Sequence, residues 1–223
     1  MARFVFAPLA VETLVYSFIF TDRLLETFFT PSDIPDEVQY FAWAPQGHKL
    51  AFVWGNNVYI KTSPGSARQQ VTFNGEDNWL LNGIPDWVYE EEMFSTNQGL
   101  WWSPGGGEHV AYAEFNDTEV RNIEYTWYGA KQYPSTVSIA YPKPGTPNRV
   151  VKLFVVNTDN VTEITEVLVP ASFSTSENYL ATVQWLKRVQ NHLILQIYSL
   201  SGSRMRPSNK KKTTKETDRY CGV

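Results

Sequence analysis

Short apolar runs separated by turn residues dominate the chain after its first thirty positions. Small and large apolar side chains alternate at Leu50–Val53 and at Val110–Ala113, as expected of strands with one buried face. Helical periodicity is scarce. The pattern therefore predicts an all-β protein of short strands, with further strands at 58–60, 70–73, 136–139, 151–156 and 193–197.

A similar turn sequence, followed each time by a strand, occurs twice in the middle of the chain. Residues 43–47 (WAPQG) lead into the strand at Leu50, and residues 102–106 (WSPGG) lead into the strand at Val110. Proline fixes φ near −65° at the first corner of such a turn, and glycine accepts the positive φ that follows. An aromatic strand end followed by a turn with Pro and Gly and then by a short strand is typical of β-propeller blades. The copies are farther apart than the usual blade period of about 40 to 50 residues, and an acidic insertion between them accounts for the excess.

That insertion contains the sequence DWVYEEEMF at residues 86–94, in which three consecutive carboxylates lie among aromatic side chains. Crowded carboxylates repel one another unless a cation, a metal or a proton joins them. Burial by Trp87, Tyr89 and Phe94 would raise their pKa further until an opposite charge is supplied. Two interpretations follow from the residues alone: a site for an ammonium group, or a solvated acidic turn.

Composition excludes some partners. The chain has 223 residues and a net charge of −4, but the polar tail after residue 200 carries 7 basic and 2 acidic residues, which leaves −9 on the first 200 residues. The remaining body is acidic, which argues against nucleic acid as a partner. The single cysteine, Cys221, forms no disulfide within the chain.

Localisation signals are few. Pro8 and Glu12 interrupt the apolar first twenty residues, so we expect neither a membrane span of about 20 apolar residues nor a signal peptide there. Asn116 and Asn160 each begin an N-x-[ST] triplet, the acceptor sequence for N-glycosylation in secreted proteins.

No catalytic apparatus is predicted. Ser103 is preceded two residues earlier by Trp101, and the following Pro104 has no amide hydrogen to donate to an oxyanion, so the nucleophile-elbow pattern fails. The three histidines include none at a metal-binding spacing with another histidine or a cysteine. Residues 105–107 (GGG) lack the Lys-[ST] of a phosphate-binding loop. We therefore expect no catalytic residues, no metal and no cofactor.

Several segments together resemble a known family. They are GIPDWVYEEEMF (83–94), LWWSP (100–104), AEFNDT (113–118), QYP (132–134), YPK (141–143) and QWLKRVQN (184–191). The chain resembles, from about Pro31 to Ile197, the N-terminal β-propeller of the dipeptidyl peptidase IV and fibroblast activation protein family. The resemblance implies an incomplete propeller of about three to four four-stranded antiparallel blades, with a short acidic helical or loop insertion.

The resemblance also implies roles for three residues. Glu91 and Glu92 correspond to the glutamates that hold the free α-amine of a peptide substrate of X-Pro or X-Ala type, and Phe94 to a residue lining the outer part of that pocket. An ammonium has three donors, and two carboxylates on one short segment accept two of them. By the same resemblance the protein belongs at the plasma membrane or outside the cell, as a glycoprotein.

Domain boundaries are predicted from the limits of this resemblance. Residues 1–30 are an apolar segment that does not match, 31–200 a partial propeller, and 201–223 a basic, disordered tail. The family's Ser/Asp/His triad belongs to a C-terminal hydrolase domain without a counterpart in this sequence. We therefore expect a truncated propeller of a post-proline serine dipeptidyl peptidase that is inactive alone.

Two other functions stay open. One is a non-enzymatic, membrane-associated scaffold that resembles the family's inactive members, which are partners of membrane channels. The other is an unrelated WD-type adaptor. In either case an open arc of blades leaves unpaired strand edges, which predicts self-association or pairing with another chain.

Overall fold

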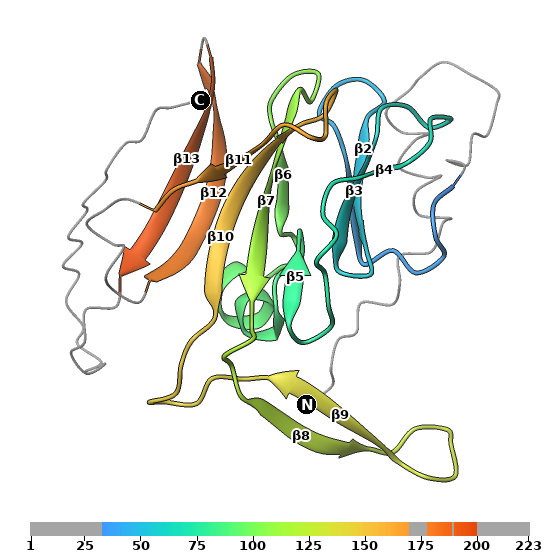
Figure 1. The fold of residues 1–223 in the computed structure, drawn as a ribbon, viewed down its shortest axis with the longest axis vertical. Helices are drawn as coiled ribbons and strands as arrows, with labels where there is room; N and C mark the ends of the chain where they lie inside the picture. Colours follow the sequence, from blue (N-terminus) through green and yellow to red (C-terminus); the bar gives the residue numbers. More distant parts are fainter. Residues whose placement is uncertain (1–32, 170–177, 189, 200–223) are drawn as a thin grey trace. The chain divides into compact units, whose positions relative to one another are not determined.

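The structure is a computed structural model that describes residues 33–169, 178–188 and 190–199. The chain divides into two compact units, Met1–Val167 and Leu168–Val223, and each is described by itself. Within the described residues the chain consists of antiparallel β-strands and one short helical turn (Figure 1). The predicted all-β class with a short acidic helical insertion is therefore confirmed.

The first sheet of the N-terminal unit has four strands in chain order. They are β1 (Tyr40–Trp43), β2 (Leu50–Trp54), β3 (Asn57–Lys61) and β4 (Gln69–Gln70). The two-residue turn between β2 and β3 has positive φ at both positions, 55° at Gly55 and 60° at Asn56. Both angles are needed in the type I′ hairpin turn, and Gly and Asn are the residues that adopt them at least cost.

The second sheet positions the acidic segment. Its strands are β5 (Leu80–Asn82), β6 (Leu100–Trp102), β7 (His109–Asn116), β10 (Val150–Asn157) and β11 (Ile164–Val167), in the order β11-β10-β7, with β5 and β6 both paired to β7. Leu80 lies opposite Asn116, whereas Leu100 lies opposite Tyr112. Thus β5 and β6 share one strand position, and the chain leaves the sheet between them.

Two hairpins complete the described residues. In the N-terminal unit, β8 (Asn122–Trp127) pairs only with β9 (Ser135–Ala140) among the described strands. The second unit contains β12 (Asn178–Arg188) and β13 (Gln190–Ser199), whose register shifts between Leu180 and Thr182.

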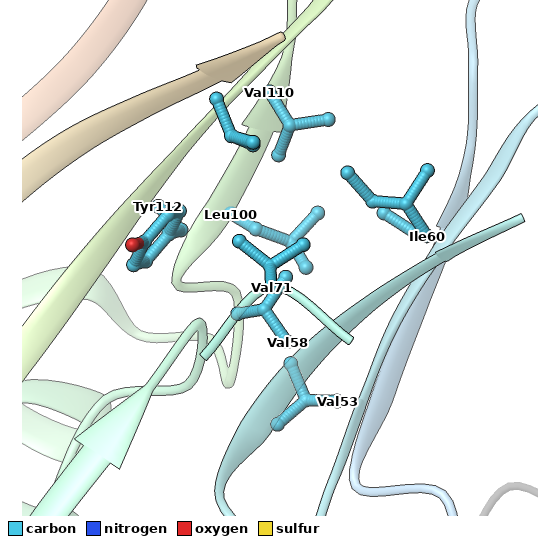
Figure 2. Packing of buried hydrophobic residues seen from close by; sticks show 9 residues of the cluster. Val53, Val58, Ile60, Val71, Leu100, Val110 and Tyr112 are labelled. Carbon is cyan, nitrogen blue, oxygen red and sulfur yellow. The ribbon is translucent and has the colours of Figure 1, made fainter. Parts of the chain in front are cut away.

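The core of the N-terminal unit lies between the faces of the two sheets. Side chains from β2, β3, β6 and β7 point toward one another in Figure 2, and most of them are branched aliphatic residues. The fully buried members include Val53, Val58, Ile60, Leu100 and Val110. Burying such side chains contributes about 1.5–3 kcal/mol each, so the sheet that carries the acidic insertion is fixed against the first sheet.

The predicted repeat of a turn followed by a strand is confirmed, since the two copies form equivalent hairpins. Trp43 of β1 lies opposite Leu50, and Trp102 of β6 lies opposite Val110. The two turns contain glycines of the same backbone angle, since φ is 85° at both Gly47 and Gly105.

One predicted strand is too long. The strand expected at 70–73 ends at Gln70, because the Thr72 hydroxyl oxygen, instead of a backbone carbonyl, accepts the amide hydrogen of Val58 at 2.9 Å. Phe73 beyond it is 77% exposed. The predicted domain boundaries at residues 30 and 200 and the polar tail lie outside the described residues.

Candidate functional site

Two glycines close the base of the acidic insertion. The amide hydrogens of Gly83 and Gly99 are donated to the carbonyl oxygens of Ala113 and Gly83, at 2.9 and 3.1 Å. Ala113 in turn donates to Gly99 at 2.9 Å. A Cβ on Gly99 would lie 2.6 Å from the carbonyl carbon of Gly83, so any larger residue would have to displace backbone.

Asp86 begins the helical turn of the insertion. Its Oδ2 accepts the amide hydrogen of Val88 at 2.8 Å, and its carbonyl oxygen accepts that of Glu90 at 2.9 Å. The chain then forms a single turn of π-helix, η1 (Tyr89–Phe94), which ends where Ser95 adopts a left-handed conformation with φ of 54°. Single π-turns of this kind are rare, and those that occur often lie at functional sites.

The turn separates its aromatic and acidic side chains. Tyr89 is 1% exposed, whereas Glu91 and Glu92 are both exposed and Glu90 is half-buried. The prediction that neighbouring rings desolvate Glu91 and Glu92 is therefore wrong, because the rings face the protein. Glu91 and Glu92 are consecutive residues of the turn, and the side chains of both are accessible to solvent.

Phe94 belongs to an aromatic cluster beneath the turn. Its ring makes edge contacts with Tyr89, Trp101 and Phe115, with centroid distances of 5.3, 6.0 and 6.2 Å. Tyr89 also contacts Phe115 at 5.0 Å. Phe94 is half-buried, so it fixes the turn to β6 and β7 while part of its surface remains accessible.

The buried charges of this region are different residues from those expected. Arg149, just before β10, forms ion pairs with Asp86 through Nη1 and with Asp117 through Nε, the latter at 3.1 Å. The three residues are between 2% and 6% exposed. The Cζ atom of Arg149 also lies 5.9 Å from the centre of the Tyr89 ring, within the range of a cation–π contact.

Two carboxylates share one guanidinium in this cluster, and the pKa of each carboxyl reflects that. Burial raises the pKa of Asp86 against the opposing effect of Arg149. Burial, and then the negative charge of Asp86, raise the pKa of Asp117 to about 7. Burial therefore makes both carboxyls bind a proton more readily than the carboxyls of isolated aspartates do.

Sequence reasoning missed this cluster. Asp117 is the middle residue of the glycosylation triplet that begins at Asn116, and none of the sequence motifs contains Arg149. No spacing rule joins residues 86, 117 and 149, because residues 117 and 149 are brought together by the pairing of β7 with β10 and Asp86 follows β5, which pairs with β7. The only available signal was the Asp immediately before the aromatic and acidic run.

The remaining candidate residues are outside the acidic turn in the sequence. Asn116 is half-buried and Asn160 exposed, and the side-chain oxygen of each accepts a hydrogen bond from the threonine hydroxyl two residues later, at 2.6 and 2.7 Å. Ser103 is 0% exposed, and its hydroxyl oxygen accepts the amide hydrogen of His109 at 3.0 Å, as expected for a turn residue.

Two kinds of feature are absent from the described ranges. Three or more metal-binding side chains do not come together anywhere in residues 33–169, 178–188 and 190–199. In the same part of the chain, no helix has the length and apolar character needed to cross a membrane.

The fold and the site define a class: propeller-type antiparallel sheets, one of which carries an acidic insertion between two segments of an edge strand. The chain belongs to the dipeptidyl peptidase IV N-terminal region family, whose model matches residues 15–221.

Individual relatives agree with this assignment. The chain is 47% identical to the human (Homo sapiens) prolyl endopeptidase FAP over 182 residues, covering 76% of this chain and 24% of that protein. It is 46% identical to dipeptidyl peptidase 4 of Felis catus, covering 78% and 25%. It is also 35% identical to the inactive dipeptidyl peptidase 10 of Rattus norvegicus, covering 72% and 20%.

A solved structure shows the same fold. Dipeptidyl peptidase 4 of Porphyromonas gingivalis superposes with a TM-score of 0.67 at 27% identity, covering 75% of this chain and 23% of that one. The chain thus spans about a quarter of the length of the relatives that it matches.

Proposed function

We propose that the acidic turn binds the free α-ammonium group of a peptide, with Glu91 and Glu92 as the two acceptors. The observation that carries this proposal is that both carboxylates are exposed and adjacent on a turn whose other side chains anchor it. Each charge-assisted hydrogen bond to an ammonium contributes about 1.5–3 kcal/mol. An exposed acidic pair on a flexible loop would lose part of that gain to the entropy of ordering.

The anchoring of the turn supports the proposal. The glycine neck at Gly83 and Gly99 fixes both ends of the insertion, Asp86 caps its first turn, and Tyr89 is buried beneath it. The glutamates are therefore presented on a rigid base, which reduces the entropic cost of binding. Phe94 supplies accessible aromatic surface next to them, and we assign it to contact with the first side chain of the peptide.

The substrate class rests on the relatives. Proteins named dipeptidyl peptidase 4 and prolyl endopeptidase match this chain at 46–47% identity, so we propose peptides whose second residue is proline or alanine. Serine-type dipeptidyl peptidase activity would need a hydrolase domain in addition to this chain. We accordingly expect the purified 223-residue chain to bind such peptides without cutting them, and release of dipeptide from a Gly-Pro chromogenic substrate would contradict the second part.

Binding is tested with a peptide that begins Gly-Pro and carries a fluorophore at its C-terminus. Anisotropy should report binding to the wild-type chain and a loss of about tenfold or more in affinity for the Glu91→Gln, Glu92→Gln variant. The matched control is Glu124→Gln with Glu166→Gln, which removes the same charge from two other exposed glutamates. Equal affinity of wild type and the Glu91, Glu92 variant would refute the proposal.

A non-enzymatic, membrane-associated scaffold is the second candidate, and the 35% identity to an inactive dipeptidyl peptidase favours it. In this case the chain would act at a membrane through protein contacts. Binding to a membrane-channel subunit that is unchanged by Glu91→Ala with Glu92→Ala would support the scaffold. Failure to bind such a subunit, together with amine-dependent peptide binding, would support the first proposal.

A further inference from the structure

Arg149 contacts the acidic segment at two places and the second sheet at a third. Its guanidinium pairs with Asp86 and lies over the ring of Tyr89, and these two residues bracket the start of η1. Its Nε binds Asp117, which directly follows β7. One side chain from the start of β10 therefore joins the base of the acidic turn to the end of the neighbouring strand.

We propose that Arg149 is a positioning residue for the amine site: by holding Asp86 and Tyr89 against Asp117, it sets the orientation in which Glu91 and Glu92 meet a peptide ammonium. This inference rests on the proposed function of the two glutamates. Arg149 itself, which is 6% exposed, does not contact the peptide.

The chemistry of the cluster favours positioning over stability. A buried ion cluster is often no more stable than apolar side chains of the same volume. Here the two aspartates and one arginine leave one negative charge unbalanced when both carboxyls are ionised, which makes the cluster a poor stabiliser. What the guanidinium provides is geometry, since its planar fork binds two carboxylates in fixed directions and a lysine ammonium does not.

Ionisation of Asp117 gives the proposal a distinctive readout. Among the described residues, the charged groups that act on Asp117 are Asp86 and Arg149, and the uncharged ring of Tyr89 covers the arginine. The pKa of Asp117 is raised to about 7, so its bond to Arg149 becomes fully charge-assisted only above that pH. Peptide affinity should therefore rise as the pH increases through 7, because the ion pair between Asp117 and Arg149 strengthens and the cluster gains a negative charge.

The test uses the full 223-residue chain and the fluorescent Gly-Pro peptide between pH 5.5 and 7.5, below the usual pKa of a peptide ammonium of about 7.7–8.0. Wild-type affinity should rise about fivefold over this range, the size of a modest coupling between sites. Asp117→Asn should abolish the rise. Arg149→Lys should weaken binding about fivefold or more at pH 7.5, whereas Arg121→Lys, at an exposed arginine, should leave it unchanged.

If Arg149→Lys does not fold, a second variant still tests the inference. Asp86→Asn with Asp117→Asn and Arg149→Met removes every charge of the cluster at similar volume, and it should retain a cooperative melt while binding the peptide more weakly and without pH dependence. Wild-type affinity with the wild-type pH profile in Arg149→Lys and in this triple variant would overturn the inference. If Glu91→Gln with Glu92→Gln weakens binding but these variants do not, only the positioning role fails. If the glutamate variant also binds normally, the proposed function fails with it.

Discussion

Gly99 donates its amide hydrogen to the carbonyl oxygen of Gly83 across 3.1 Å, so the two ends of the acidic insertion meet at a single backbone hydrogen bond. The insertion therefore leaves and rejoins the edge of the second sheet at one point. A seventeen-residue excursion closed in this way behaves as an appendage of β7, to which both glycines are bonded through Ala113. The segment that carries Glu91 and Glu92 therefore begins and ends at this hydrogen bond.

Replacing Gly99 by alanine should destabilise the fold. The new Cβ would meet backbone atoms of Gly83 at 2.6 Å, a contact that forces the neck apart at a cost of about 1–3 kcal/mol. Gly106→Ala is the control, since nothing lies within 4 Å of a Cβ built there. Urea unfolding of both variants measures the difference, and equal midpoints would show that the neck does not constrain the insertion.

The pH dependence of stability should reveal Asp117. The carboxyl of an unfolded aspartate has a pKa near 3.9, whereas that of folded Asp117 is raised to about 7. Between these values the folded state keeps a proton that the unfolded state has lost, so this group lowers the free energy of unfolding as the pH rises from about 4 to about 7. Above 7 its contribution is constant.

Asp117→Asn should therefore become more stable relative to wild type across that interval, by at most about 4 kcal/mol. Chemical unfolding of both proteins at several pH values between 4 and 8 measures the difference. A constant difference between the two proteins, or one that moves in the opposite direction, would show that Asp117 is ionised throughout.

The sequence predicted the fold better than it predicted the charge arrangement. The alternation of side chains in the strands and the WAPQG and WSPGG turns predict the two equivalent hairpins, because these signals lie within the few residues that form each hairpin. The end of β4 was missed because the Thr72 side chain takes over a backbone acceptor role, which no propensity scale contains.

The candidate site shows the same division. The acidic run itself was visible in the sequence, and its helical or loop character was foreseen. The sequence does not predict that Tyr89 and Phe94 point inward, since a π-turn has a different periodicity from an α-helix. Nor does it predict the pairing of Asp86 and Asp117 with Arg149, which depends on strand order and register in the second sheet.

Glycosylation of Asn116 and Asn160 should occur when the chain is directed through the secretory pathway. Asn160 is exposed and Asn116 half-buried, so the former should be the more fully occupied. Treatment with an N-glycosidase should increase gel mobility by the equivalent of two glycans, and Thr162→Ala should remove one while Thr162→Ser retains it. Absence of any shift in wild type would contradict both assignments.

Self-association of the purified chain is expected at its exposed hairpin. Trp127, Tyr128 and Tyr133 of the β8–β9 hairpin are 48%, 80% and 78% exposed, and a lone two-stranded hairpin gains stability by pairing. Light scattering after size-exclusion chromatography should show species larger than a monomer. Serine at all three positions should reduce them, and a monodisperse wild-type monomer would contradict the expectation.

The most direct test of the amine site is a double-mutant cycle between the protein and the peptide. The peptide is used with a free or an acetylated N-terminus, and the protein as wild type or as Glu91→Gln with Glu92→Gln, with affinities measured by titration calorimetry. We expect a coupling free energy of about 1.5 kcal/mol or more between the ammonium and the glutamate pair. A coupling of zero, with acetylation and the glutamine substitutions acting independently, would contradict it.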